Sequence, residues 1–428
     1  MYISLSNRNQ TDIFLCKSLK RRPRVRDMDE INRWADIDEN LLKEISKRFH
    51  AYDDYIQLRL VCKEWSLKLP KIPNGNKIPW LLLPDETVKN HSYEDEEIYH
   101  LMQLAAADDE TLDTCALEEK DIYHVKLPEM QSDNKFIRGS GHGWFIVQSI
   151  SDGTMQMLNP FTNRRSYLPP VSAFPDIIDY QPDNHGDEYT LWDFRDIRST
   201  MERDLVHRRH VYKVIINSSP EHDIENFMAV VIFGPNRRLA FYKPGNMRWV
   251  EFPTRDKRFD DVIFFQEKIY AINNYGQLYE FDTKTRAGLK GGIHETRPPS
   301  KIFLSPLRHK YLIGCPNGSL LMLVRHIEKK GKEFETSKFD IYELKRNRKK
   351  WSTLDNLGNY ILVIGFNSSV QIPVPYLSKG NQIWFTDNLS LYYGPVAQDI
   401  GIFDLDHGSF QRVLLAVKFL CPPVWLLP

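Results

Sequence analysis

The feature that most constrains this fold is a pattern of alternating apolar runs that repeats from Phe136 to the end of the chain. Each repeat has an alternating run, a polar or glycine-containing turn and usually a second short run. This arrangement is typical of a hairpin of half-buried strands. Another apolar run usually precedes each copy. The copies read MQMLNPFTNRRSYLP, LAFYKPGNMRWVEFP, LYEFDTKTRAG, FDIYELKRNRKKWSTL and IGIFDLDHGSFQRVL.

Three to four strands per repeat, spaced by roughly 40 to 60 residues, predict a β-propeller. Each small sheet buries its surface against its neighbours, and closure of the ring removes exposed ends. We therefore predict a mainly β chain with about six blades, and five or seven blades also fit the pattern. A β-sandwich is the alternative, but the chain has too many strands for one sandwich.

Two similar proline-bounded apolar segments stand at opposite ends of the β region. They read IPWLLLP at residues 78–84 and CPPVWLLP at residues 421–428. A propeller commonly closes by placing its N- and C-terminal strands in one blade. We therefore expect these segments to lie close together, against the alternative that two short apolar strands resemble each other by coincidence.

A short segment at residues 31–70 has a different character, because its apolar residues recur at helical spacing. Asp36 and Asp38 are candidate helix caps. The segment has too little apolar surface to fold alone. It is either a helical cap on the β domain or a surface for another protein. The first stripe contains Leu41, Leu42, Ile45 and Phe49, and the second contains Tyr55, Leu58, Val61, Cys62 and Trp65.

The composition argues against several classes of protein. The 428 residues include 57 basic and 57 acidic side chains, so no net field favours nucleic acid. No stretch approaches the length of about 18 apolar residues that spans a membrane, and the polar first residues are unlike a signal peptide. Five scattered cysteines without a CxxC pair indicate a reducing compartment. We expect an intracellular protein of the nucleus and/or cytoplasm.

Two segments carry runs of charge. Residues 17–26, within a tail at 1–30, are KSLKRRPRVR. A nuclear-import signal is one interpretation, and a solvated, disordered leader is favoured over it. Residues 85–121 are strongly acidic, and we interpret them as an insertion or long surface loop with a short helix around EIYHLMQLAAA. Binding of a basic partner is an alternative role, but such charge runs are usually only solvated.

The sequence predicts no catalytic, cofactor-binding or metal-binding residue. The glycines of RGSGHGWF precede a β-run, whereas a phosphate loop needs a following helix. The stretch GCPNGS around Cys315 does not match a nucleophile elbow. His207 and His210 have no evident third ligand, so a solvated loop is favoured over a metal site. A propeller hydrolase or lyase is the alternative from another functional class.

The helical segment resembles an F-box, a module whose helices dock onto a Skp-type adaptor. The matching residues are Ile37, then LLKEISKRF, then LRLVCKEW. The family usually has proline where this chain has Asp38, which places a charge at the start of the docking surface. The resemblance implies adaptor-binding roles for Ile37, Leu41, Leu42, Ile45, Leu58, Val61, Cys62 and Trp65.

The β region resembles the kelch-like domain of plant F-box proteins of the KIB type, in which F-box and propeller occur together. The resemblance covers residues 34–428, although residues 175–210 and the acidic stretch match poorly. It implies an F-box at 31–70 and a propeller at 78–428. The landmarks are PWLLLP, GSGHGWF, LNPFTNRRSYLPP, GFNSS, NQIWFTDN and IGIFDLDHGSF.

This resemblance implies a substrate receptor of an SCF-type ubiquitin ligase. The F-box would hold the adaptor, and through it a cullin and a RING protein, while the propeller holds a target protein. Such a chain contributes proximity and no bond-making chemistry. A propeller scaffold without a ligase role is the alternative. No cofactor, nucleic acid or membrane is expected as a partner.

We expect the target surface on propeller loops, because binding residues concentrate on loops over a rigid scaffold. We expect the turn tips of such a ring to be displayed together at one face. Basic residues among them suggest acidic patches on the target. The candidates are His142, Asn163, Arg164, Arg165, Arg237, Arg238, Asn367, Ser368 and Ser369.

Overall fold

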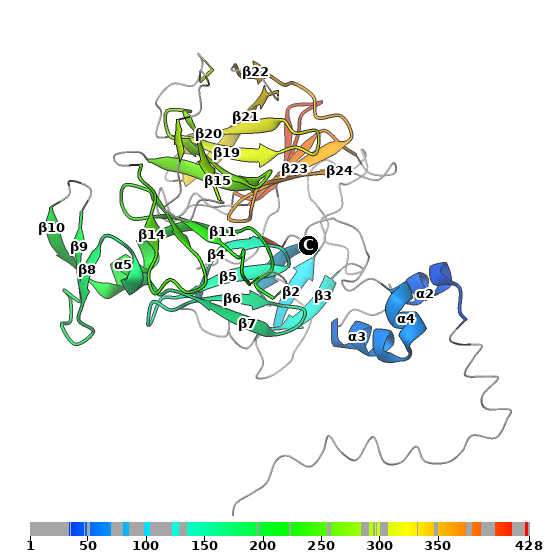
Figure 1. The fold of residues 1–428 in the computed structure, drawn as a ribbon. Coiled ribbons are helices and arrows are strands. Elements are labelled where there is room, and N and C mark those ends of the chain that lie inside the picture. Colours follow the sequence, from blue (N-terminus) through cyan, green and yellow to red (C-terminus); the bar gives the residue numbers. More distant parts are fainter. Residues whose placement is uncertain are drawn as a thin grey trace, which may run out of the picture. The chain divides into compact units, whose positions relative to one another are not determined.

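The protein divides into two compact units, Met1–Gly75 and Asn76–Pro428, and each is described by itself (Figure 1). The computed structural model describes residues 34–69 except 35, 47 and 49–51, the stretches 80–84, 98–102, 122–127 and 424–426, and residues 135–412. Gaps within the last range are 194, 196, 222–223, 255–257, 284–290, 294–295, 297, 300–306, 332, 346–349, 374–378 and 387–398. The predicted basic tail at 1–30 lies outside the described residues.

The described residues of the first unit include three short helices, α2 (Glu39–Ser46), α3 (Tyr52–Leu60) and α4 (Lys63–Lys68). The second apolar stripe is therefore divided between two helices and does not form one. The helical conformation ends with α3 and begins again at α4. Before α4, the Cys62 side chain accepts a hydrogen bond from the backbone N–H of Trp65 at 3.5 Å. This contact caps the start of α4.

The second unit is built from small, mainly antiparallel sheets of strands that are mostly consecutive in sequence, as the repeats predicted. The first sheet contains β28 (Val424–Leu426), β1 (Trp80–Pro84), β2 (Ile98–Met102) and β3 (Ile122–Lys126), and the second contains β4 (Lys135–Gly141), β5 (Trp144–Ser149), β6 (Met155–Asn159) and β7 (Arg164–Leu168). The third contains β11 (Val211–Ile216), β12 (Ala229–Phe233), β13 (Arg238–Tyr242) and β14 (Val250–Glu251), and the fourth contains β15 (Phe259–Phe265), β16 (Lys268–Asn273), β17 (Leu278–Asp282) and β18 (Gly291–Ile293).

Two further blades are joined edge to edge as one nine-stranded sheet, through the single parallel pair Gly314 and Val370. With these two, the described part of the chain contains six blades, the number favoured from the sequence. The fifth contains β19 (Arg308–Gly314), β20 (Leu320–Lys330), β21 (Glu333–Leu344) and β22 (Ser352–Thr353), and the sixth contains β23 (Tyr360–Ile364), β24 (Val370–Pro373), β25 (Gln382–Phe385), β26 (Gly401–Asp404) and β27 (Ser409–Arg412). Strands β23 and β25 are an exception to the antiparallel pattern, because they pair in parallel.

The blades follow one another around a ring. The strands β28, β4, β11, β15 and β19 lie next to each other in that order, and β24 pairs with β19. The ring closes between the sixth and first blades, where the Trp384 and Trp425 rings lie 5.8 Å apart. The β-propeller predicted from the repeats is therefore the fold of this unit.

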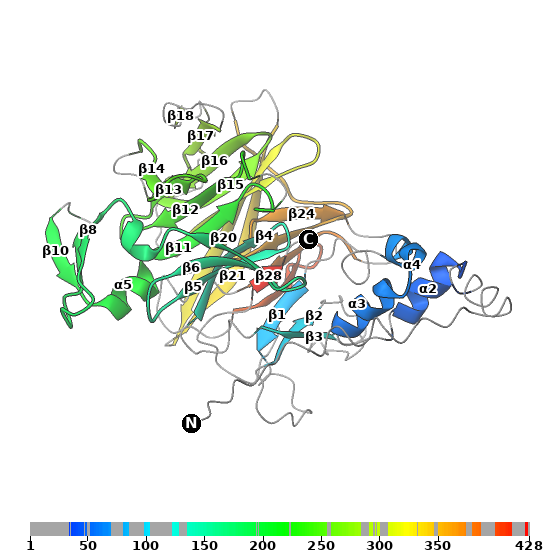
Figure 2. The same cartoon turned by 60° about the horizontal axis from the view of Figure 1, so that its bottom comes forward.

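The two ends of the β region lie side by side, as their similar sequences predicted. Strand β28 pairs with β1 in antiparallel register, with Leu81 opposite Trp425 (Figure 2). Both side chains are fully buried. The first blade therefore contains the last strand, so the chain ends tie the ring together.

The acidic segment contains a strand where a short helix was expected. β2 pairs with β1 on one side and with β3 on the other. The helix prediction is wrong because residues 98–102 complete a blade, and tertiary pairing overrides a weak local helical preference. The remaining acidic residues, 85–97 and 103–121, lie outside the described part.

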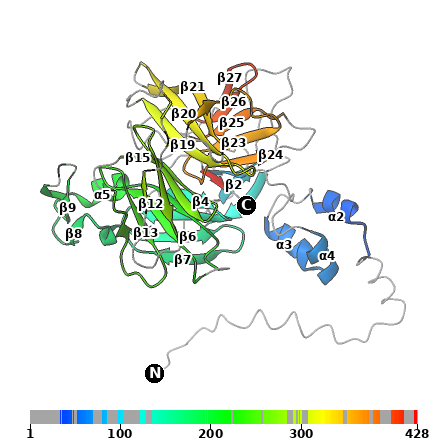
Figure 3. The same cartoon turned by 45° about the horizontal axis from the view of Figure 1, so that its top comes forward.

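An additional small subdomain stands between the second and third blades, at residues 171–209, and we call it the insertion. It contains the short helix η4 (Val171–Ala173), a meander of β8 (Ile177–Tyr180), β9 (Tyr189–Trp192) and β10 (Arg198–Met201), and helix α5 (Arg203–Arg209). The meander belongs to none of the six blades and lies at the margin of the propeller (Figures 1 and 3).

The strands are more deeply buried than half-buried hairpins would be. All residues of β5 and β12 are buried, because each blade is covered by neighbours on both faces. Charges are also enclosed. The Lys213 ammonium lies 2.6 Å from Asp261, whose other oxygen accepts a bond from the N–H of Leu312 at 2.9 Å. This contact ties β11, β15 and β19 together.

Candidate functional site

The helical unit has a small core of its own. Leu42, Leu58 and Trp65 are buried within it. The indole N–H of Trp65 donates to the carbonyl of Trp34 at 2.7 Å, and the Lys68 ammonium donates to the carbonyl of Ile37 at 2.8 Å. Three of the eight residues assigned to the adaptor are therefore largely buried in this chain and contribute to the core of the unit.

Several other apolar residues of the unit are exposed, whereas Tyr55 and Leu69 are also buried. Leu41 and Val61 have exposed fractions of 54% and 58%, while Ile37, Ile45 and Cys62 are partly exposed. Leu60 and Leu67, which the sequence reasoning missed, are exposed by 67% and 77%. Apolar surface of this extent is unusual on so small a unit. The two missed residues could have been found as apolar positions off the predicted stripes.

Asp38 has a structural role at the start of helix α2, in addition to the charge that it places there. Its carboxylate accepts hydrogen bonds from the N–H groups of Asn40 and Leu41, at 2.9 and 3.1 Å. Its carbonyl accepts the N–H of Leu42 at 2.9 Å. Asp38 is therefore the N-cap of α2, and its charge is directed toward the positive end of that helix.

The turns of the propeller belong to two opposite faces. Successive antiparallel strands reverse direction, so the β4–β5 and β6–β7 turns share one face, which we call the first face. The β5–β6 and β12–β13 turns share the second face. Contacts agree with this assignment. The Arg164 guanidinium on β7 pairs with Glu221 at 3.0 Å, and the Trp144 indole N–H donates to Ser219 at 3.1 Å.

The predicted target residues do not form one cluster. On the first face, His142 and Asn163 are exposed turn residues with φ values of 53° and 52°. Arg165 is also exposed there, on β7. These residues stay candidates for contact with a target.

Arg237 and Arg238 lie at the β12–β13 turn, on the second face, and both are engaged within the fold. Arg237 pairs with Asp260 at 3.3 Å, and Arg238 pairs with Asp176 at 3.2 Å and with Glu251 at 3.1 Å. The expectation that all basic tips are displayed together at one face is therefore wrong. Alternation of strand direction separates them.

Asn367 and Ser369 are buried and do not lie at an exposed loop tip. The Asn367 amide donates to the carbonyl of Ser368 at 2.9 Å, and the N–H of Ser368 donates to the carbonyl of Ser140 at 3.0 Å. This loop packs against β4 and helps to close the ring. The loop is buried because closure of the ring brings strands that are distant in sequence against it. A local sequence pattern does not contain this information.

His207 of the insertion and His210, which follows the insertion, are structural residues and not part of a solvated loop. Both are buried. Burial lowers the pKa of His207, so the ring is neutral at pH 7, with Nδ1 donating to the carbonyl of Ile150 at 2.5 Å. Its Nε2 accepts the hydroxyl of Tyr189 at 2.7 Å. Residues 203–210, for which a solvated loop was expected, form helix α5 and the turn that ends it.

His210 contacts Asp176 at 3.1 Å, and the same carboxylate pairs with Arg238. Burial by itself would raise the pKa of Asp176, but the His210 and Arg238 contacts hold it below the usual value. The insertion is thus tied to the third blade by a buried charged group.

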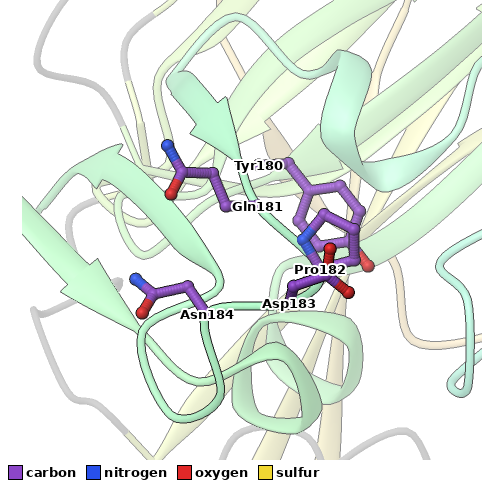
Figure 4. Close-up of a pocket in the computed structure, with 5 residues that line it drawn as sticks. All are labelled: Tyr180, Gln181, Pro182, Asp183 and Asn184. Atoms are coloured by element: carbon purple, nitrogen blue, oxygen red, sulfur yellow. The ribbon is translucent and has the colours of Figure 1, made fainter.

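The described surface includes one shallow hollow of about 550 Å³ on the insertion. It is lined by residues 180–184, which follow one another in a single loop (Figure 4). The amide of Gln181 is already bonded to Asp179 at 2.8 Å, and that of Asn184 to the carbonyl of Asp187 at 3.1 Å. This hollow does not bring together a nucleophile and a base from different elements.

The described residues also bear on metal binding and on membrane spanning. No group of three His, Cys, Asp or Glu side chains in the described ranges is placed to hold a metal ion. No helix in the same ranges is both long and apolar enough to cross a membrane.

The family model described as KIB1-4 beta-propeller matches residues 114–404, which is more than half of the chain. The chain belongs to this family. Relatives in Arabidopsis thaliana carry the name of F-box protein. F-box protein SKIP23 is 22% identical, with 92% of this chain and 95% of that protein aligned.

The relative named Putative F-box protein At5g60060 is 23% identical, with 89% of this chain and 95% of that protein aligned. The relative named Putative F-box protein At5g55150 is also 23% identical, but the alignment covers 48% of this chain and only 57% of that relative's length. The chain is therefore a plant F-box protein of the KIB type, as the sequence motifs predicted.

Proposed function

We propose that this chain is the substrate-recognition subunit of an SCF-type ubiquitin ligase. The observation that carries the proposal is the helical unit, which buries a small core yet leaves Leu41, Leu60 and Val61 exposed in a chain whose relatives are F-box proteins. Exposed apolar surface of this kind is stabilised by association with a partner. That partner is a Skp-type adaptor, which connects the chain to a cullin and a RING protein.

The adaptor surface comprises the outward members of the predicted set. Ile37, Leu41, Ile45, Val61 and Cys62 contact the adaptor, while the buried members support them. Asp38 does not oppose this role, because its carboxylate is engaged by the N–H groups at the start of α2. Leu60 and Leu67 add two further exposed apolar side chains to the helical unit.

The propeller holds the target protein, and the chain performs no chemistry of its own. The ligase accelerates transfer by raising the local concentration of target near the ubiquitin-charged enzyme. The exposed residues His142, Asn163 and Arg165 are candidates for target contact. Such a chain acts inside the cell, in the nucleus and/or cytoplasm.

The first test replaces Leu41 and Val61 with Asp in the full chain. We expect loss of adaptor co-purification, because central apolar residues of an interface contribute about 2 kcal/mol or more each. Two such losses correspond to about a thousandfold or more in affinity. Titration of the purified Skp-type adaptor by calorimetry measures the effect.

The matched control replaces Met247, an exposed apolar residue of the β unit, with Asp. It should leave adaptor affinity unchanged. Replacement of the buried Trp65 is unsuitable, because it would unfold the helical unit. If the Leu41 and Val61 variant binds the adaptor as tightly as wild type, the ligase role is wrong and a propeller scaffold becomes the better explanation.

A further inference from the structure

The insertion is anchored to the propeller by buried polar contacts at its base. The guanidinium of Arg138 on β4 donates to the carbonyls of His207 and Arg208, at 3.0 and 2.9 Å. The Gln148 amide on β5 also donates to the carbonyl of His207, at 2.7 Å. These bonds satisfy the C-terminal carbonyls of α5. The base of the insertion is therefore held rigidly.

The inner face of the meander packs on this base. Ile177, Tyr189 and Leu191 are buried in the same apolar cluster as β11 and β12, and Met201 packs against that cluster. The outer face has no such cover. Trp192 is 43% exposed and Ile178 is 40% exposed. A rigidly held sheet with uncovered apolar residues fits a binding surface better than a purely structural role.

Strand β10 is an edge of the meander, so alternate backbone groups along it point away from β9. The N–H of Asp193 on the β9 side donates to the carbonyl of Ile197 at 2.9 Å. Alternation along an antiparallel pair then directs the backbone of Ser199 toward β9, and that of Arg198 and Thr200 away from it. In the described structure, β10 pairs with β9 alone.

The side chains along this edge point alternately to the two faces of the meander. Their charge and polarity indicate what kind of strand could pair with β10. Arg198 is exposed, lies in register with Trp192 on the outer face, and makes no ion pair with the described residues. Ile197, the preceding residue, is 55% exposed and projects to the other face. A strand added beside β10 would therefore place an acidic residue opposite Arg198 and, next to it, an apolar residue opposite Ile197.

We propose that β10 is the docking site for an extended segment of the target protein, which adds a fourth strand to the meander. The segment has an acidic residue beside an aliphatic one, and backbone bonds to Arg198 and Thr200 hold it in register. This inference rests on the proposed receptor function and names the class of target segment that the receptor takes. It assigns recognition to the insertion in addition to the propeller turns.

The test uses random 12-residue peptides displayed on phage and selected on the purified full chain. We expect enriched peptides with an acidic residue next to an aliphatic one, and the affinity of one synthetic peptide is then measured by fluorescence polarisation. Thr200→Pro should weaken it by about tenfold, because the outward N–H is lost. Proline is tolerated at such an edge position, so the meander should still fold.

Two matched controls separate the edge from other effects. Thr200→Ala keeps the N–H and should bind within about twofold of wild type. Arg198→Glu should weaken binding by about tenfold, while Lys350→Glu, the same charge change at an exposed residue of the fifth blade, should not. A peptide with lysine in place of its acidic residue should recover binding to Arg198→Glu.

Several results would overturn the inference. They are the absence of enriched peptides, enrichment without an acidic residue, and equal binding to Thr200→Pro. A fourth is a wild-type dimer, seen by sedimentation, that Thr200→Pro abolishes, because the edge would then serve self-association. Adaptor affinity should be the same for all these variants, so failure here is distinct from failure of the ligase proposal.

Discussion

At the scale of single residues, charged groups in this protein mostly hold the fold together. Asp399 accepts bonds from the Arg325 guanidinium and the N–H of Thr336, both at 2.8 Å, and none of the three is exposed by more than 1%. This group connects the β20–β21 hairpin to the sixth blade. An isolated charge there would be costly, so the pairing is obligatory for folding.

Asp340 provides a pH-dependent contribution that can be measured. Bonds from His326 and Lys338, against the opposing effect of burial, lower the pKa of Asp340 to about 2. The folded state thus favours the carboxylate, so its contribution is present above the unfolded pKa of about 3.9. It is lost as the pH falls through about 2, and its full size is up to about 2 kcal/mol.

We therefore expect Asp340→Asn to lower the free energy of unfolding at pH 7 by up to about 2 kcal/mol, with the difference disappearing near pH 2. Urea denaturation at pH 7, 4 and 2.5 measures it. Asp183→Asn, at an exposed residue of the insertion, should have no effect at any pH. A difference for Asp340→Asn that stays constant with pH would contradict the assignment.

At the scale of secondary-structure elements, short pieces depend on specific end groups. Helix α2 has only eight residues and begins at a cap supplied by Asp38. Isolated helices of this length are unstable in water, so the cap and the small core around Leu42 both matter. Asp38 stands where the family usually has proline. It starts the helix at this position because its side chain caps the first N–H groups.

We expect Asp38→Ala to destabilise the helical unit by about 1 kcal/mol, because two N–H groups at the start of α2 lose their acceptor. Amide hydrogen exchange of Asn40 and Leu41 reports the change. Asp38→Asn should retain protection, and Asp36→Ala should leave it unaffected. Equal exchange in Asp38→Ala and wild type would show that α2 does not depend on this cap.

At the scale of the whole molecule, closure of the ring depends on a strand of three residues, β28. It completes the first blade beside β1 and contributes Trp425, whose ring meets Trp384 of the sixth blade. Each blade is covered by two neighbours, so opening one junction removes burial from both sides. The stability of the β unit should therefore respond to a single substitution at the closure.

We expect Trp425→Ala to lower the unfolding free energy of the β unit by about 3–5 kcal/mol, the range typical of large cavities. Trp192→Ala, at an exposed tryptophan of the insertion, should change it by less than about 0.5 kcal/mol. Guanidinium denaturation of both variants makes the comparison. Similar small losses in both would mean that the ring does not depend on β28 for closure.

The features that depend on local pattern could be predicted from the amino-acid sequence. Alternation and turn residues predicted the blades, and the matching ends at residues 78–84 and 421–428 predicted the pairing of β1 with β28. Helical spacing identified the short N-terminal helices, and motif order identified the family. These features were readable because hydrophobic period and turn chemistry are properties of neighbouring residues.

The exposure of individual side chains to a partner follows from the three-dimensional fold and could not be predicted from the sequence. Leu42 and Leu41 are adjacent and equally apolar, yet one is in the core and the other is exposed. Asn367 is buried by ring closure, Arg237 is separated from His142 by strand direction, and residues 98–102 form a strand because β1 offers an edge. Burial, facing and edge pairing depend on residues distant in sequence, so a local pattern does not contain them.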